Sequence, residues 1–148
     1  MDRYEEFHKI MQSWETAGSV PEDKIAEVEK KLGTKFPAKY REFLSMYGAA
    51  MTEGFEVAGI FEYTDRDVPP MWLDVGYYTR VSVSLLEDTL PNKEQIYISS
   101  DGGDYTFYLD TRPENYGKIL ELGPGIERFV ADDFHDFIIK ISNDKIFI

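Results

Sequence analysis

Residues 95–109 read QIYISSDGGDYTFYL, and this stretch decides the fold class. Two runs rich in β-branched and aromatic residues, 95–99 and 105–109, flank the sequence Asp101-Gly102-Gly103-Asp104. Glycine supplies the positive φ that a tight hairpin turn demands. The stretch therefore predicts an antiparallel β-hairpin, and the apolar run at 118–122 predicts a further strand.

Helices are predicted on both sides of this strand-rich region. Apolar residues recur at helical spacing over residues 2–15, 19–32, 37–47 and 131–141. Ser19 and Glu22 have the spacing of a capping box for the second of these helices. A strand over 55–61 and a helix over 71–79 complete the pattern. We therefore expect an α+β fold, with an antiparallel sheet flanked by N-terminal helices and a C-terminal helix.

The size and composition predict one globular domain over residues 1–148. The chain is 43% hydrophobic and 15% aromatic, which is enough to build a core despite a net charge of −12. It has no cysteine, which excludes disulfides, cysteine nucleophiles and cysteine zinc sites. The N-terminus lacks the apolar run of a signal peptide, and no window approaches a membrane span. We expect a cytoplasmic protein.

The negative charge is concentrated in the middle of the chain. From Glu42 to Asp110 there are 13 acidic and 3 basic residues, whereas the remainder has 15 acidic and 13 basic residues. Such a field repels nucleic acid and anionic membranes and speeds encounters with basic partners. The charge alone is equally compatible with a role in solubility.

Little in the sequence points to catalysis. His8 and His135 belong to no metal-ligand pair and are expected at the surface or at its boundary. Asp101 and Asp104 offer two carboxylates on one turn, but the turn itself explains the glycines between them. No phosphate-binding glycine loop or nucleophile elbow is present. We expect no catalytic residues, no metal and no cofactor, with an enzyme that uses Asp101 and Asp104 without a metal as a remote alternative.

Three blocks together resemble the SUKH superfamily. They are residues 36–44 (FPAKYREFL) ending at Tyr47-Gly48, residues 98–105 (ISSDGGDY) leading into Leu109-Asp110-Thr111, and residues 131–138 (ADDFHDFI). The resemblance covers roughly residues 20–142. After the first block, Gly48-Ala49-Ala50 stands where the family usually has Asn-Gly-Gly.

The resemblance implies both a fold and a role. That superfamily includes bacterial immunity proteins and domains related to yeast cell-wall regulators, and its fold is an antiparallel sheet wrapped by helices. We therefore expect an immunity protein that neutralises a cognate polymorphic toxin, often a nuclease with a basic active site. A regulatory adaptor domain of the same fold, with a partner that is not a toxin, is the alternative.

The acidic middle of the chain is the expected partner-binding surface. Trp72 is its candidate aromatic anchor, and the alternative is that this side chain simply fills the core. The acids lie on predicted loops and strand ends, where binding residues concentrate. They are Glu53, Glu56, Asp65, Asp67, Asp74, Asp101 and Asp104.

Overall fold

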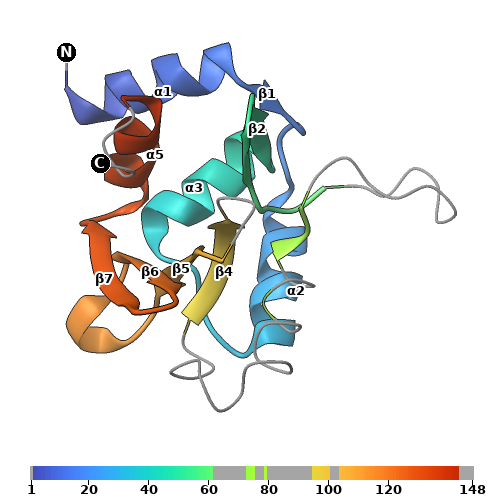
Figure 1. Cartoon of the computed structure of the whole chain (residues 1–148). Helices are drawn as coiled ribbons and strands as arrows, with labels where there is room; N and C mark the ends of the chain where they lie inside the picture. The colour runs from blue at the N-terminus through green and yellow to red at the C-terminus, as the bar shows by residue number, and fades with distance from the viewer. Residues whose placement is uncertain (1, 62–72, 76–78, 80–94, 101–103, 144–148) are drawn as a thin grey trace, which may run out of the picture.

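An antiparallel meander forms the sheet of the protein (Figure 1). The computed structural model describes residues 2–61, 73–75, 79, 95–100 and 104–143. Each strand in this part of the chain pairs antiparallel with the next, in the order β1 to β7. The strands are β1 (Glu15–Thr16), β2 (Ala50–Thr52), β3 (Phe55–Val57), β4 (Gln95–Ser100), β5 (Thr106–Asp110), β6 (Ile119–Gly123) and β7 (Ile126–Ala131).

The helices precede and follow the sheet. They are α1 (Arg3–Ser13), α2 (Glu22–Leu32), α3 (Ala38–Tyr47) and α5 (Phe134–Ser142), with a 3₁₀ turn η1 at Pro113–Asn115. Two begin with an aspartate cap: Asp2 accepts a hydrogen bond from the Glu5 N–H, and Asp133 accepts one from the Asp136 N–H. Both α1 and α3 pack against α5, and α2 packs against α3. Within the described residues, no helix is long and apolar enough to cross a bilayer.

Aromatic rings fill the space between the helices and the sheet. The Phe134 ring lies 5.9, 5.1 and 4.8 Å from the ring centroids of Phe7, Tyr40 and Phe43. One turn further along α5, Phe137 packs against Phe55 of β3 and Phe107 of β5. These side chains are buried, so α5 connects the other helices to the sheet.

The predicted fold class and the central hairpin are confirmed. Residues 95–99 lie on β4 and residues 106–109 lie on β5, and these two strands are antiparallel neighbours. The helix predicted over 71–79 is only partly described; Val75 and Thr79 are helical. The strand predicted over 55–61 ends at Val57, because Gly59 forms a parallel bridge to Asp74 instead.

The predicted capping box is wrong. Helix α2 begins at Glu22, and Pro21 occupies the cap position without a side-chain hydrogen bond. Ser19 is exposed, and the Val20 N–H donates to the Ser45 carbonyl at the end of α3. Tertiary contacts therefore set the path of the chain into α2.

Three short or edge strands had no clear pattern in the sequence. These are β1, β2 and β7. Strand β7 ends where the last helix was predicted to start, and α5 begins three residues later because Asp133 caps it. The first five residues of β7 are exposed or half-buried, so this strand has no regular apolar alternation.

Two glycines let the end of α3 lie against the chain that follows β3. Gly48 ends α3 at φ 75°, and its carbonyl accepts a hydrogen bond from the Ile60 N–H at 2.9 Å. A Cβ on Gly59 would lie 1.7 Å from the Gly48 oxygen. Because the added Cβ would meet a backbone oxygen and its own position is fixed by the backbone, neither side can yield by changing a rotamer.

We predict that Gly59→Ala destabilises the protein by about 3 kcal/mol or more, since the backbone must separate at this crossing. Urea unfolding at neutral pH measures the change. Gly33→Ala is the control for steric contact, because nothing lies near its added Cβ and its only cost is the strain of alanine at a φ of 72°. The free energy of unfolding of that variant should fall by about 1 kcal/mol. Equal falls in the two variants would contradict the close approach of Gly59 to the Gly48 carbonyl.

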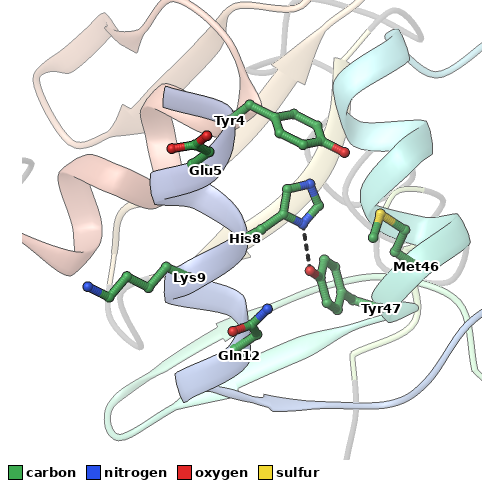
Figure 2. Close-up of a pocket in the computed structure, with 7 residues that line it drawn as sticks. All are labelled: Tyr4, Glu5, His8, Lys9, Gln12, Met46 and Tyr47. Atoms are coloured by element: carbon green, nitrogen blue, oxygen red, sulfur yellow. Dashed lines mark hydrogen bonds between the residues drawn. The ribbon is translucent and has the colours of Figure 1, made fainter. Parts of the chain in front are cut away.

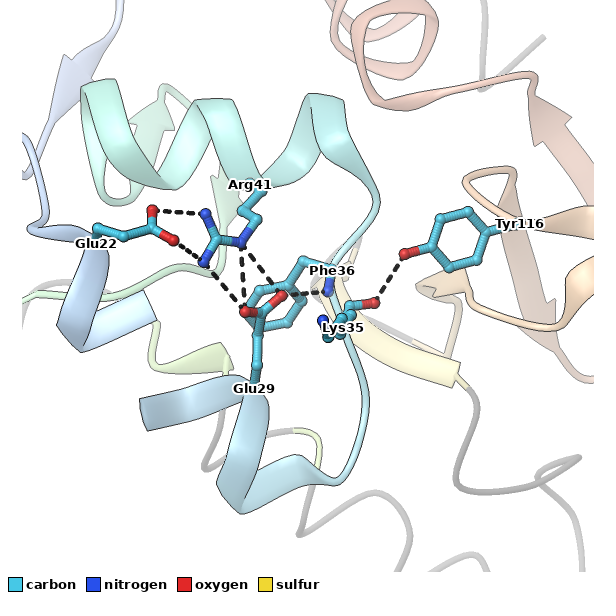
Figure 3. A network of polar contacts seen from close by, with 6 residues as sticks. All are labelled: Glu22, Glu29, Lys35, Phe36, Arg41 and Tyr116. Atoms are coloured by element: carbon cyan, nitrogen blue, oxygen red, sulfur yellow. Dashed lines mark hydrogen bonds and ion pairs between the residues drawn. The ribbon is translucent and has the colours of Figure 1, made fainter. Parts of the chain in front are cut away.

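A buried carboxylate ties α2 to α3 (Figure 3). Glu29 is 8% exposed, and its Oε2 accepts a hydrogen bond of 2.8 Å from the Phe36 N–H. The Arg41 guanidinium contacts both Glu29 oxygens at 3.2–3.3 Å and also pairs with Glu22. One arginine therefore neutralises carboxylates at both ends of α2.

We predict that Glu29→Ala lowers the free energy of unfolding by about 2 kcal/mol or more, because it leaves a buried N–H unpaired and deprives Arg41 of its buried partner. Glu27→Ala on the same helix is the matched control. Glu27 pairs with Lys31 at the surface, and its loss should cost about 0.5 kcal/mol or less. Chemical denaturation of both variants measures the two changes. Similar losses of unfolding free energy would refute the role of the buried network.

Candidate partner-binding surface

The meander brings three hairpin turns to the same end of the sheet. In a sequence of antiparallel neighbours, every second turn falls at the same end. The turns are Glu53-Gly54 between β2 and β3, the connection from β4 to β5, and Pro124-Gly125 between β6 and β7. Segments far apart in the sequence therefore present their loops together.

A continuous row of paired residues crosses the sheet near this end. Cross-strand partners share one face of a sheet, and this row lies on the face opposite the core residues Phe55, Val57 and Phe107. None of its members is buried. The row is Glu15, Met51, Glu56, Ser100, Thr106, Leu122 and Glu127.

The exposed acids of this region define what we call the acidic hairpin end: Glu15, Glu53, Glu56, Asp104 and Glu127. The basic neighbour of Glu127, Arg128, lies on the opposite face of β7 and pairs with Glu121 at 2.6 Å. The alternation of the strand thus turns a positive charge away from the acidic face. This arrangement suits contact with a basic surface.

The structure brings together three of the acids predicted to bind a partner and separates a fourth. Glu53, Glu56 and Asp104 lie at the acidic hairpin end. Asp74 is half-buried and pairs with Gly59, beyond the other end of β3. There its charge adds to burial in raising the pKa of Tyr40.

The other predicted residues, Asp65, Asp67, Trp72 and Asp101, lie outside the described part of the chain. Sequence reasoning missed Glu15 and Glu127, because their strands β1 and β7 had not been predicted. The sequence offered no signal for β7, since residues 127, 128 and 129 are all exposed and the strand has no regular apolar alternation.

Both histidines meet where α1, α3 and α5 converge. Their ring centroids lie 6.5 Å apart, and the His135 ring stacks on Phe7 at 4.2 Å. His135 is only 4% exposed, so its predicted place at the surface or its boundary is wrong; Phe7 and Tyr4 of α1 cover it. Burial lowers the pKa of His135, and the nearby charge of Lys39 lowers that pKa further.

An open groove lies between α1 and α3 beside this junction (Figure 2). Its volume is about 430 Å³, and α1 contributes Tyr4, Glu5, His8, Lys9 and Gln12, while α3 contributes Met46 and Tyr47. The described residues contain no cluster of three His, Cys, Asp or Glu side chains that could hold a metal ion.

Comparison with known proteins identifies relatives of the chain. Residues 19–140 match the model of the SMI1 / KNR4 family (SUKH-1). A segment of 92 residues is 36% identical to the uncharacterized protein YnaB of Bacillus subtilis (strain 168). The match covers 59% of this chain and 58% of YnaB, so it spans little more than half of that relative.

The burial of His135 predicts a pH dependence of stability. Its pKa is lowered in the folded protein, so the unfolded chain binds the proton more tightly, and the free energy of unfolding falls as the pH drops through the unfolded value of about 6.5. When the pH is lowered from 7.5 to 5.5, the free energy of unfolding of the protein should fall by about 1 kcal/mol more than that of the His135→Phe variant. Urea titrations at both pH values test this, and parallel losses in the two proteins would contradict it.

Proposed function

The chain belongs to the SMI1 / KNR4 family (SUKH-1), and from that premise we propose that it is an immunity protein that binds and neutralises a cognate toxin domain with a basic surface. A nuclease domain is the favoured toxin, because an active site that holds phosphates presents basic groups. The protein acts as a single domain in the cytoplasm and works by occlusion, without catalysis, metal or cofactor.

The observation that carries this proposal is the acidic hairpin end. Its five acids come from β1, β3, β7 and two hairpin turns, and all are exposed on one region of the sheet. A net charge of −12 on the chain strengthens the field at this surface. Acidic groups arranged in this way attract a basic partner from a distance and orient it before contact.

The surface also has apolar area between its acids. Met51, Leu122 and Thr106 stand in the same row as Glu56, and each is half-buried. Charges at the rim mainly set the association rate, whereas apolar area at the centre of an interface contributes to affinity. The described part of this face thus has both components of a protein interface, and Trp72 is the proposed further anchor.

The proposal predicts a toxin gene beside the gene of this protein, and it is tested with the product of that gene. Co-expression should restore the growth of bacteria that produce the toxin, and the two purified proteins should form a stoichiometric complex. Failure to protect, together with recovery of a partner that is not a toxin, would favour the regulatory adaptor over the immunity protein.

We predict that the triple variant Glu53→Lys, Glu56→Lys, Asp104→Lys associates with the toxin about tenfold more slowly at low salt, because the attractive field is reversed where docking occurs. The difference should shrink at high salt, where the charges are screened. Stopped-flow or surface-based kinetics at two ionic strengths measure both effects.

The control variant is Asp23→Lys, Glu27→Lys, Glu114→Lys. It makes the same change in net charge at exposed positions on α2 and η1, away from the acidic hairpin end. Its association should slow by about threefold or less. Equal association rates for the two triple variants would contradict the proposal, because only the net charge of the protein would then matter and not the position of the acids.

A further inference from the structure

We propose that the groove between α1 and α3 binds one arginine side chain presented by a protein partner. This site is separate from the acidic hairpin end and goes beyond the proposed immunity function. The inference rests on three features of the groove: its aromatic walls, a chain of polar contacts that leaves an acceptor oxygen at its floor, and the charges around it.

The walls of the groove present one aromatic and one thioether side chain to solvent, and both are polarisable. Tyr4 is 51% exposed and Met46 is 44% exposed, and these are two of the four large hydrophobic side chains exposed in the described residues. Both line the groove, on opposite sides of it (Figure 2). The guanidinium of arginine stacks favourably on aromatic faces, and methionine adapts its shape to the methylene stem of a bound side chain.

A chain of polar contacts crosses the floor of the groove. His8 Nδ1 lies 2.6 Å from the Tyr47 hydroxyl oxygen, and His8 Nε2 lies 3.4 Å from Glu42 Oε1. Which atom donates in the contact between His8 and Tyr47 follows the tautomer of the imidazole, and the Tyr47 oxygen keeps at least one lone pair in either case.

The tyrosine offers an acceptor to a ligand. Whether its hydroxyl donates to His8 Nδ1 or accepts from it, a lone pair of the Tyr47 oxygen remains to accept a hydrogen bond in the groove. Burial raises the pKa of Tyr47, and the nearby Tyr4 and Glu42 add to that effect, so the phenol stays neutral. The groove therefore suits a ligand that is rich in N–H donors, and it offers no activated tyrosine nucleophile.

The charges around the groove favour a cation but also limit its affinity. Glu5 lines the groove, and Glu42 lies behind His8, whereas Lys9 is the opposing positive charge on the rim. The planar guanidinium can stack on Tyr4 and donate to the Tyr47 oxygen, while Glu5 supplies a negative charge on the lining of the groove. An ammonium is more strongly hydrated and lacks the planar face, so lysine fits the groove less well.

The test uses the free protein and small probes, so it is independent of any toxin. N-acetyl-arginine methylamide is titrated into the isotope-labelled protein, alongside the uncharged citrulline analogue and the lysine analogue. The arginine probe should shift the NMR signals of His8, Met46 and Tyr47 with at least about threefold higher affinity than either analogue. Equal affinities, or shifts centred on the acidic hairpin end, would overturn the assignment.

Variants locate the site and the sign of its charge. Tyr4→Ala should weaken the arginine probe at least about threefold, whereas Tyr116→Ala should leave its affinity unchanged. Tyr116 is a matched control, since it is 49% exposed and lies outside the groove, where its hydroxyl donates to the Lys35 carbonyl.

Tyr47→Phe removes the acceptor oxygen and should also weaken binding of the arginine probe. Lys9→Gln should tighten binding and Glu5→Gln should weaken it; the opposite signs, or no effect of Tyr4→Ala, would refute the proposal.

Discussion

The packing of Phe134 holds the architecture together. Its ring contacts Phe7 of α1 and both Tyr40 and Phe43 of α3, so the three helices share one buried aromatic cluster. Asp133 caps the same turn of α5, and Lys39 at the start of α3 pairs with the Asp133 carboxylate at 2.7 Å. The position of α5 is thus set by rings on its inner side and by an ion pair at its first turn. Aromatic burial supplies most of the energy at such a junction, because the ion pair is partly exposed to solvent and contributes about 1 kcal/mol or less.

The arrangement of the helices decides which part of the sheet is free to bind. Phe137 directs α5 onto the face that carries Phe55 and Phe107. The row of Glu56, Ser100 and Thr106 lies on the other face and stays accessible at the end where the hairpins turn. A meander with a covered core face therefore produces an exposed acidic surface from residues that are spread over the length of the chain.

The two proposed binding surfaces use different physical effects. The acidic hairpin end acts over a distance, because its charges attract and orient a basic partner before contact. The groove between α1 and α3 acts at short range, through stacking on Tyr4 and hydrogen bonds to the Tyr47 oxygen. The first effect weakens in salt, and the second depends far less on ionic strength. In an interface that combined them, the acidic hairpin end would mainly set the rate of association, and the groove would mainly set the lifetime of the complex.

The sequence by itself determined the fold class, the central hairpin, the main helices and the acidic character of the middle of the chain. These follow from local rules: the alternation of residues 95–99 and 105–109, the helical spacing of apolar residues, and the composition. Tertiary structure alone decided the pairing of β1 and β7 with the sheet, the start of α2 and the burial of His135. It also brought Tyr4 and His8 to Tyr47 and placed Glu15 and Glu127 in one row with Glu56. The physical reason is that these features depend on which residues meet across the fold, whereas periodicity and capping patterns report only on neighbours along the chain.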